Sequence, residues 1–294
     1  MTARRRLVRV PASSANLGPG YDVLAAALTL HLELEVEETE SFEVDAGGLD
    51  IATDRSNLCV RAFESLRPAD GIAFRIKSEI PLAGGLGSSA AAIVAGLLAA
   101  DHLYELALEP ADVLARATAI EGHPDNVAAA LHGGFVVCSA DGDGAPVATR
   151  IEVPEGLEAV VVVPEGERVP TPNARKAIPA SVPHSDAVAN VAAASELVLG
   201  LQRSDLGLIG RGLADRLHQP HRAHLYPLSM EVVDAAAGLG ALGATISGAG
   251  PTVLVWSFWQ STGKVVEALE GRFGERADIR RVPFSALGAD VPEL

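Results

Sequence analysis

The run PLAGGLGSSAA at residues 81–91 constrains the fold of this 294-residue chain more than any other segment. Its three glycines, Gly84, Gly85 and Gly87, let the main chain turn tightly and approach a ligand without a side-chain clash. The alanine-rich stretch 90–100 that follows has a strong helix propensity. The run therefore predicts a glycine loop that leads into a helix, whose first N–H groups and dipole attract anions such as phosphate.

Other interpretations of this loop can be weighed against the sequence. One alternative is a plain turn before a buried helix, which needs no ligand. The sequence leaves this interpretation open. A Walker A loop requires Gly-Lys-Ser/Thr, and no lysine lies between Lys77 and Lys176. Residues 85–90 fit the dinucleotide pattern G-x-G-x-x-A, but Pro81 interrupts the strand that should run into the first glycine. No strand ending in an acidic residue follows about 20 residues later, which also argues against a dinucleotide fold. The residues favour a phosphate loop of another kind.

Composition excludes several classes of partner. A formal net charge of −15 argues against nucleic acid and against an anionic membrane surface, although a small anion responds to local donors. The arginines at 4–6 are not followed by a signal-peptide core, and no apolar run is long enough to span a membrane. Cys59 and Cys138 lie far apart in apolar surroundings, which is typical of buried thiols. We therefore expect a cytoplasmic protein without nucleic-acid or membrane partners.

The expected strands and helices mix without regular βα alternation, which favours an α+β fold in two domains, 1–153 and 154–294. Strands are predicted at 7–10, 30–36, 72–76, 135–138, 159–163 and 279–283, and on both sides of a turn at 248–251. Helices are predicted at 88–103, 110–120, 187–201, 204–217, 229–237 and 263–273. The proline-rich segment 164–183 is expected to be irregular.

Four segments, in this order along the chain, resemble the motifs of the GHMP small-molecule kinases, and most closely those of their homoserine kinase branch. They are VPASSANLGPGYD at 10–22, the glycine loop, EGHPDNVA at 121–128 and TISGAGP at 245–251. The first segment selects the branch, because it lacks the lysine or Gly-Glu-His element of mevalonate kinases and galactokinases. The chain departs from the pattern at Tyr21, where phenylalanine is usual, and at Ala129, where proline is common.

The resemblance implies a two-domain GHMP kinase fold, with a nucleotide-binding α+β domain followed by a ferredoxin-like α+β domain. It also implies a homodimer that uses ATP and Mg²⁺ to phosphorylate the side-chain hydroxyl of L-homoserine in threonine biosynthesis. Two alternatives remain open: a related kinase that acts on a different alcohol, and a non-catalytic metabolite sensor of the same fold.

By the same resemblance, Ser89 and Glu121 are the expected Mg²⁺ ligands, since Mg²⁺ takes few protein oxygens beside phosphates and waters. Alternatively, Ser89 caps the helix, Glu121 is a solvated helix end, and Asn57 caps a helix at 58–66. The expected ATP-binding residues are Asn57, Pro81, Leu82, Ala83, Gly84, Gly85, Leu86, Gly87, Ser88, Ser89, Ala90 and Ala91.

The substrate pocket implied by the resemblance must recognise an ammonium, a carboxylate and a hydroxyl. Asp22 is expected to bind the ammonium, and Asn16 either end of the substrate. Arg175, in a Thr-x-x-x-Arg element, and Arg222 are expected to clamp the carboxylate, because a planar guanidinium suits bidentate binding. His123 is expected to shape this pocket.

The expected catalytic residues are Asp125, Asn126 and Thr171. Asn126 is oriented toward the substrate hydroxyl in this interpretation, and Thr171 lies near the transferred group. Whether Asp125 accepts a proton stays open, because a loose phosphoryl-transfer transition state demands little prior deprotonation.

Overall fold

The long strand β2 (Leu24–Glu38) organises the first sheet of the computed structural model, which describes residues 3–82, 84–166 and 170–292. Along it, Leu32, Leu34 and Val36 are buried, whereas Glu35 and Glu37 face outward and pair with arginines of the neighbouring strands. This two-residue period turns one face of the sheet toward the core. The sheet order is β3-β4-β2-β5-β6, with β1 along β2; the other strands are β1 (Arg5–Ala15), β3 (Glu43–Asp45), β4 (Ile72–Ser78), β5 (Phe135–Ala140) and β6 (Pro146–Ile151).

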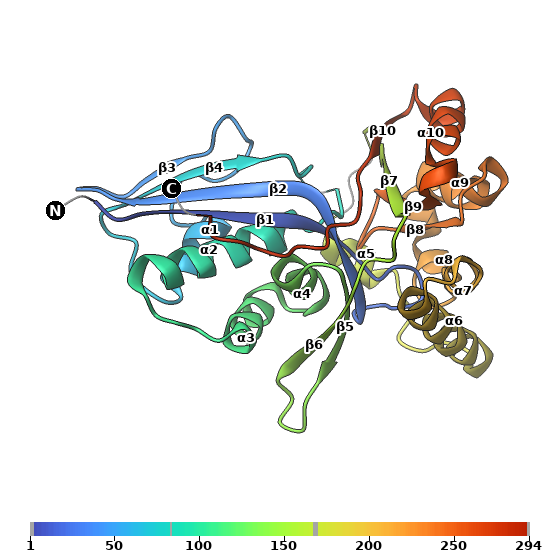
Figure 1. Ribbon diagram of the computed structural model, residues 1–294, viewed down its shortest axis with the longest axis horizontal. Coiled ribbons are helices and arrows are strands. Elements are labelled where there is room, and N and C mark those ends of the chain that lie inside the picture. Colours follow the sequence, from blue (N-terminus) through green and yellow to red (C-terminus); the bar gives the residue numbers. More distant parts are fainter. Residues whose placement is uncertain (1–2, 83, 167–169, 293–294) are drawn as a thin grey trace.

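Four helices cover the inner face of this sheet (Figure 1). They are α1 (Leu58–Glu64), α2 (Ser88–Tyr104), α3 (Pro110–Glu121) and α4 (Asp125–His132). Helix α2 is buried along most of its length because it packs against the sheet and against the other three helices. Helix α4 was not predicted, and its first residue is Asp125. Two expected site segments, 88–89 and 125–126, therefore lie at helix N-termini.

The second sheet is antiparallel in the order β10-β7-β9-β8. Its strands are β7 (Leu157–Pro164), β8 (Gly243–Ile246), β9 (Val253–Phe258) and β10 (Ala277–Arg281), and α9 (Pro227–Ala236) and α10 (Trp259–Phe273) cover one face. The opposite face contributes Trp256, whose ring lies 5.7 Å from that of Phe135 and 5.1 Å from that of Phe284. One continuous core therefore joins the two sheets.

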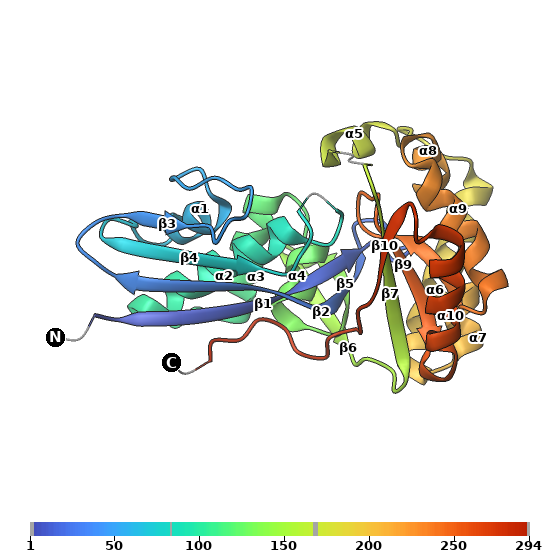
Figure 2. The same ribbon diagram turned by 90° about the horizontal axis from the view of Figure 1, so that it is seen from above.

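Four more helices lie beside the second sheet (Figure 2). They are α5 (Thr171–Lys176), α6 (His184–Arg203), α7 (Leu206–Arg211) and α8 (Gln219–Arg222). Helix α5 lies in the segment that was predicted to be irregular. The predicted helix 204–217 is wrong beyond Arg211: Gly212 is the C-cap of α7, and the main chain that follows bonds to side chains instead, with Arg216 N donating to Asn190 Oδ1 of α6 at 2.8 Å.

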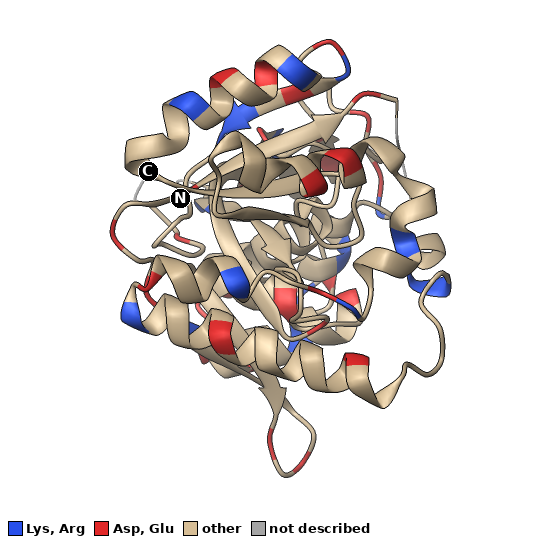
Figure 3. Ribbon diagram, turned by 90° about the vertical axis from the view of Figure 1, so that its right-hand side faces the viewer, with Lys and Arg blue, Asp and Glu red and all other residues tan. Residues whose placement is uncertain are grey.

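The chain after β10 returns to the first sheet, where Arg9 and Asp290 exchange main-chain hydrogen bonds of 2.9 Å (Figure 1). The predicted two-domain α+β class is confirmed. The division at residue 153 stays a prediction: the two sheets lie on either side of it, but the last residues contact the first half. No helix within the described ranges is long and apolar enough to cross a membrane. On the face formed by the second half, basic and acidic positions are interspersed (Figure 3).

Candidate active site

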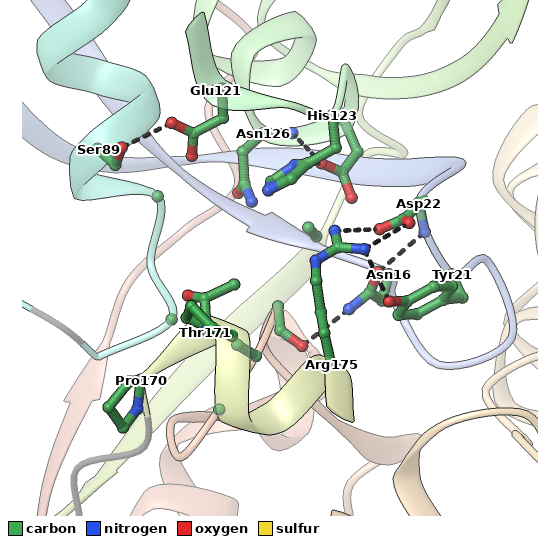
Figure 4. Close-up of a pocket in the computed structure, with 18 of the residues that line it drawn as sticks. Asn16, Tyr21, Asp22, Ser89, Glu121, His123, Asn126, Pro170, Thr171 and Arg175 are labelled. Atoms are coloured by element: carbon green, nitrogen blue, oxygen red, sulfur yellow. Dashed lines mark hydrogen bonds and ion pairs between the residues drawn. The ribbon is translucent and has the colours of Figure 1, made fainter. Parts of the chain in front are cut away.

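A cavity of about 530 Å³ opens where the two halves meet. Its walls come from five separated parts of the chain and from Arg222. The five parts are the loop after β1, the glycine loop, the segment from the end of α3 to the start of α4, helix α5, and the turn at 248–250. Figure 4 shows Ser89 and Glu121 at one end and Asp22 with Arg175 at the other, with His123 and Asn126 between them. The fold therefore gathers polar groups that are distant in sequence around one space.

The glycine loop has the conformation that its sequence predicts. Gly85 and Gly87 have φ angles of +83° and +70°, which favour glycine. A Cβ on Gly87 would lie 2.2 Å from Ser13 Oγ. Ser247 of the C-terminal half donates a 2.7 Å hydrogen bond to Gly85 O, so both halves hold the loop. The N-cap residue of α2 is Gly87, so the alternative in which Ser89 caps this helix is wrong.

Ser89 and Glu121 meet at one end of the cavity, beside the glycine loop. Ser89 Oγ donates a 2.6 Å hydrogen bond to Glu121 Oε2, although 32 residues separate them. A hydroxyl and a carboxylate are the hard oxygen donors that suit Mg²⁺ beside phosphates and waters. Among the described residues, no group of three or more His, Cys, Asp or Glu side chains is arranged to hold a metal ion. The pair thus fits a cation that takes few ligands from the protein.

Asp125 sits in a tight hydrogen-bond network at the start of α4. Its Oδ1 accepts from Asn126 N at 2.7 Å and lies 2.7 Å from His123 Nδ1, and its side chain is only 2% exposed. The bond to Asp125 raises the pKa of His123. Asn126 is oriented in turn by Ser13, which donates a 2.8 Å hydrogen bond to Asn126 Oδ1. The network fixes both predicted catalytic groups before any ligand arrives.

At the opposite end, Asp22 and Arg175 bind each other. Arg175 Nη1 and Nη2 donate to the two carboxylate oxygens of Asp22 at 2.9 and 2.7 Å. The same Nη1 donates to the hydroxyl of Tyr21 at 2.9 Å. The hydrogen bond to Asp22 raises the pKa of Arg175, which therefore stays charged. The two residues that were predicted to bind opposite ends of an amino acid thus form one bidentate ion pair.

Arg222 is buried to 1% exposure and still lines the cavity. Its Nε donates to Ala174 O at 2.9 Å, and its Nη1 donates to Gly248 O at 3.2 Å and lies 3.3 Å from His218 Nδ1. Burial lowers the pKa of His218 to about 4, so this imidazole is neutral. It donates from Nε2 to Gly18 O at 2.8 Å, which leaves Nδ1 to accept from the guanidinium.

The Asn16 side chain bonds to the loop 16–22 and to the turn at 248–250. Its Nδ2 donates to Gly248 O at 2.8 Å, and its Oδ1 accepts from Asp22 N at 3.0 Å. Both polar ends of the side chain therefore bind main chain, although Asn16 lines the cavity. The geometry gives it the task of holding Asp22 and the glycine turn in place.

A second, more apolar cavity of about 210 Å³ shares Ser88 and Ser89 with the first. Asn57 lies in its wall, where Oδ1 accepts from Cys59 N at 2.9 Å as the N-cap of α1 and Nδ2 donates to Ala52 O at 2.7 Å. Asn57 therefore both caps α1 and lines this cavity. The apolar walls of this cavity suit a flat ring better than a charged group. They include Leu32, Leu49, Ile51, Ile76, Leu82 and Ala92.

Most predicted site residues line one of these two cavities. The predicted ATP contacts that line neither are Pro81, Gly84, Leu86, Ala90 and Ala91, and Ala83 lies outside the described residues. Leu86 points into the core, while its carbonyl accepts from Ser13 N at 3.1 Å. The predicted site residues did not include Tyr21, Pro170, Pro172 or the aliphatic wall of the smaller cavity. Only Tyr21 carried a signal, as a departure from the family pattern.

Comparison with known proteins finds two family models and several similar proteins. Residues 57–134 match the GHMP kinases N terminal domain, and residues 197–273 match the GHMP kinases C terminal domain. The chain is 41% identical over 295 residues to a homoserine kinase of Moorella thermoacetica, covering 97% of this chain and 99% of that protein. It is 40% identical to one of Thermus thermophilus, covering 90% and 91%. The crystal structure of homoserine kinase from Cytophaga hutchinsonii matches with a TM-score of 0.87 and 31% identity, over 98% of this chain and 97% of that one.

Proposed function

The chain belongs to the GHMP kinase family, and we infer that it catalyses the ATP-dependent phosphorylation of the side-chain hydroxyl of L-homoserine, a step of threonine biosynthesis. The similarity to homoserine kinases extends over nearly the whole chain, so it includes both halves of the cavity. The observation that carries the inference is the placement of an acid and two guanidiniums, from Asp22, Arg175 and Arg222, opposite a glycine loop at the N-terminus of α2. That arrangement suits an amino acid facing a polyphosphate.

We assign ATP to the two cavities, which share Ser88 and Ser89. The apolar walls of the smaller cavity suit the adenine ring, and the phosphate chain would then lie at the start of α2. The first N–H groups of a helix have no partner within the helix, so they are free to bind the β- and γ-phosphates. Main chain rather than a lysine side chain holds the nucleotide in this arrangement.

Ser89 and Glu121 would hold Mg²⁺, as their contact and their oxygen chemistry suggest. The ion, when bound, neutralises charge on the phosphates. Glu121 lies at the end of α3, where Gly122 stops the helix with a φ of +94° and turns the chain toward His123. The protein thereby presents the carboxylate beside the phosphate loop.

Homoserine is expected to enter by separating the Asp22–Arg175 pair. Its ammonium binds Asp22, and its carboxylate binds Arg175 and Arg222, so one ion pair is replaced by several. The hydroxyl then points toward Asn126, whose amide is already oriented by Ser13. Catalysis consists of positioning and charge stabilisation, since phosphoryl transfer requires little covalent chemistry from the protein.

A coupled assay of ADP release tests this function with homoserine, mevalonate and galactose as acceptors. We expect turnover with homoserine and none with the other two, because they lack an ammonium for Asp22. Turnover with mevalonate or galactose but not with homoserine would show that the chain is a related kinase that acts on a different alcohol. Tight ATP binding without turnover on any acceptor would favour a metabolite sensor. The homodimer remains a prediction from the family resemblance, and the cytoplasmic location remains a prediction from the composition of the chain.

A further inference from the structure

Tyr21 lies on a loop that the C-terminal half holds in place. Asn190 and His218 donate hydrogen bonds of 2.7 and 2.8 Å to main-chain carbonyl groups of the loop 16–22. Several residues of this loop have positive φ, including Asp22 at 57°. The position of the Tyr21 ring relative to the second half is therefore set by contacts on both of its sides.

The Tyr21 ring lies against both arginines of the cavity. The Cζ atom of Arg175 is 5.5 Å from the ring centroid, and that of Arg222 is 5.3 Å away. The His218 ring packs against it at 5.5 Å. An aromatic face attracts a guanidinium, which offsets the repulsion between two cations brought to the same place. One ring thus helps to hold two side chains that come from different helices, α5 and α8.

The Tyr21 hydroxyl adds a bond that the ring alone cannot make. Of the three hydrogen bonds that Arg175 donates to described residues, two go to Asp22 and one goes to this hydroxyl. A substrate ammonium that binds Asp22 removes the first two. The third does not depend on Asp22, so it can keep the guanidinium inside the cavity (Figure 4).

The hydroxyl stays a neutral acceptor for Arg175. Burial, followed by the charge of Asp22, raises the pKa of Tyr21 above its usual value, so the phenol keeps its proton at neutral pH. Its oxygen accepts from Arg175 without adding a second negative charge beside Asp22. The hydroxyl therefore acts on the substrate carboxylate only through the guanidinium that it holds.

We propose that Tyr21 is the positioning residue of this two-arginine clamp: its ring holds Arg175 and Arg222, and its hydroxyl keeps Arg175 aimed at the substrate carboxylate while Asp22 binds the ammonium. This inference rests on the proposed function. Tyr21 then contributes to the affinity for the amino acid. It contributes neither to nucleotide binding nor to the phosphoryl-transfer step.

The test compares Tyr21→Phe and Tyr21→Leu in steady-state kinetics. For Tyr21→Phe we expect the KM for homoserine to rise about 5- to 10-fold, as loss of one hydrogen bond predicts, with kcat and the KM for ATP changed less than about twofold. Tyr21→Leu should raise the homoserine KM further, because both arginines lose the ring. On an Arg175→Met background, Tyr21→Phe should have no additional effect, since the hydroxyl acts through Arg175.

Tyr104→Phe is the matched control, because the Tyr104 ring also faces an arginine, Arg4 at 5.3 Å, but lies outside both cavities. It should leave all constants unchanged. Calorimetric titration of homoserine without ATP gives a second measurement of the same loss of affinity. An unchanged homoserine KM in Tyr21→Phe, or an equal rise on the Arg175→Met background, would overturn the proposal while leaving the proposed function intact. If the unaltered protein neither binds nor phosphorylates homoserine, the proposed function fails and this inference fails with it.

Discussion

Replacing Gly87 by alanine tests whether the main chain of the glycine loop holds the nucleotide. The new methyl group would lie 2.2 Å from Ser13 Oγ and 3.0 Å from Asn126 Oδ1, two atoms that are hydrogen-bonded to each other. The φ of +70° costs an alanine about 1–2 kcal/mol, and the forced displacement costs about 1–3 kcal/mol more. We therefore expect Gly87→Ala to lower the free energy of unfolding by about 2–5 kcal/mol.

The same displacement should weaken ATP binding. Moving the loop breaks at least one charge-assisted hydrogen bond to a phosphate, worth about 1.5–3 kcal/mol, which corresponds to about a 10- to 150-fold loss of affinity. Denaturant unfolding and calorimetric titration with a non-hydrolysable ATP analogue and Mg²⁺ measure the two effects separately.

Gly144→Ala is the control, because Gly144 has a similar φ of +84° and nothing within 4 Å of its added Cβ. It should lose only about 1–2 kcal/mol of stability and bind the nucleotide normally. If Gly87→Ala folds and binds the analogue as tightly as the unaltered protein, the reasoning about the loop is refuted.

Three further predictions concern Arg222, Glu121 and His218. Arg222→Met should raise the homoserine KM about 100-fold, as loss of a buried charge partner predicts, while the KM for ATP stays within about twofold; steady-state kinetics would contradict the assignment if ATP affinity collapsed instead. Glu121→Gln should lower kcat and shift the Mg²⁺ titration to higher concentration, with the exposed Glu105→Gln as control; an unaltered titration would remove Glu121 from the metal site. Because the pKa of His218 is lowered from 6.5 to about 4, the unfolded chain takes up this proton first, so stability present above pH 6.5 should fall as pH drops from 6.5 to 4. Unfolding measured across this range should show a shallower pH dependence for His218→Asn, and an identical slope would contradict the buried neutral imidazole.

Local sequence signals were sufficient where the backbone itself imposes the structure. The glycine loop and the start of α2 follow from residues that permit positive φ and then favour a helix, so Gly87 and Ser88 lie as predicted. The strand predicted at 30–36 likewise lies within β2. The helix predicted at 204–217 failed beyond Arg211 because the main chain there bonds to Asn190 of α6, and that contact is invisible to a local pattern.

The environment of each site residue required the tertiary structure. Asp22 and Arg175 are 153 positions apart, and their pairing depends on how the loop after β1 meets helix α5. The sequence predicted both as ligand contacts, but not that they bind each other. Nor did it predict that Asn16 is held at both ends by main chain.

The sequence by itself determined the phosphate loop, the family resemblance and the residue types of the site, because short motifs encode backbone conformation and chemistry within a few positions. Only the tertiary structure decided which of these groups touch, which of them are buried, and that Tyr21 joins two arginines across the cavity. The physical reason is that hydrogen-bond partners and desolvation depend on chain segments that pack together from distant parts of the sequence. The Ser89–Glu121 contact exists because α2 packs against α3, and the Asp22–Arg175 pair exists because the loop after β1 meets α5 where the two halves join.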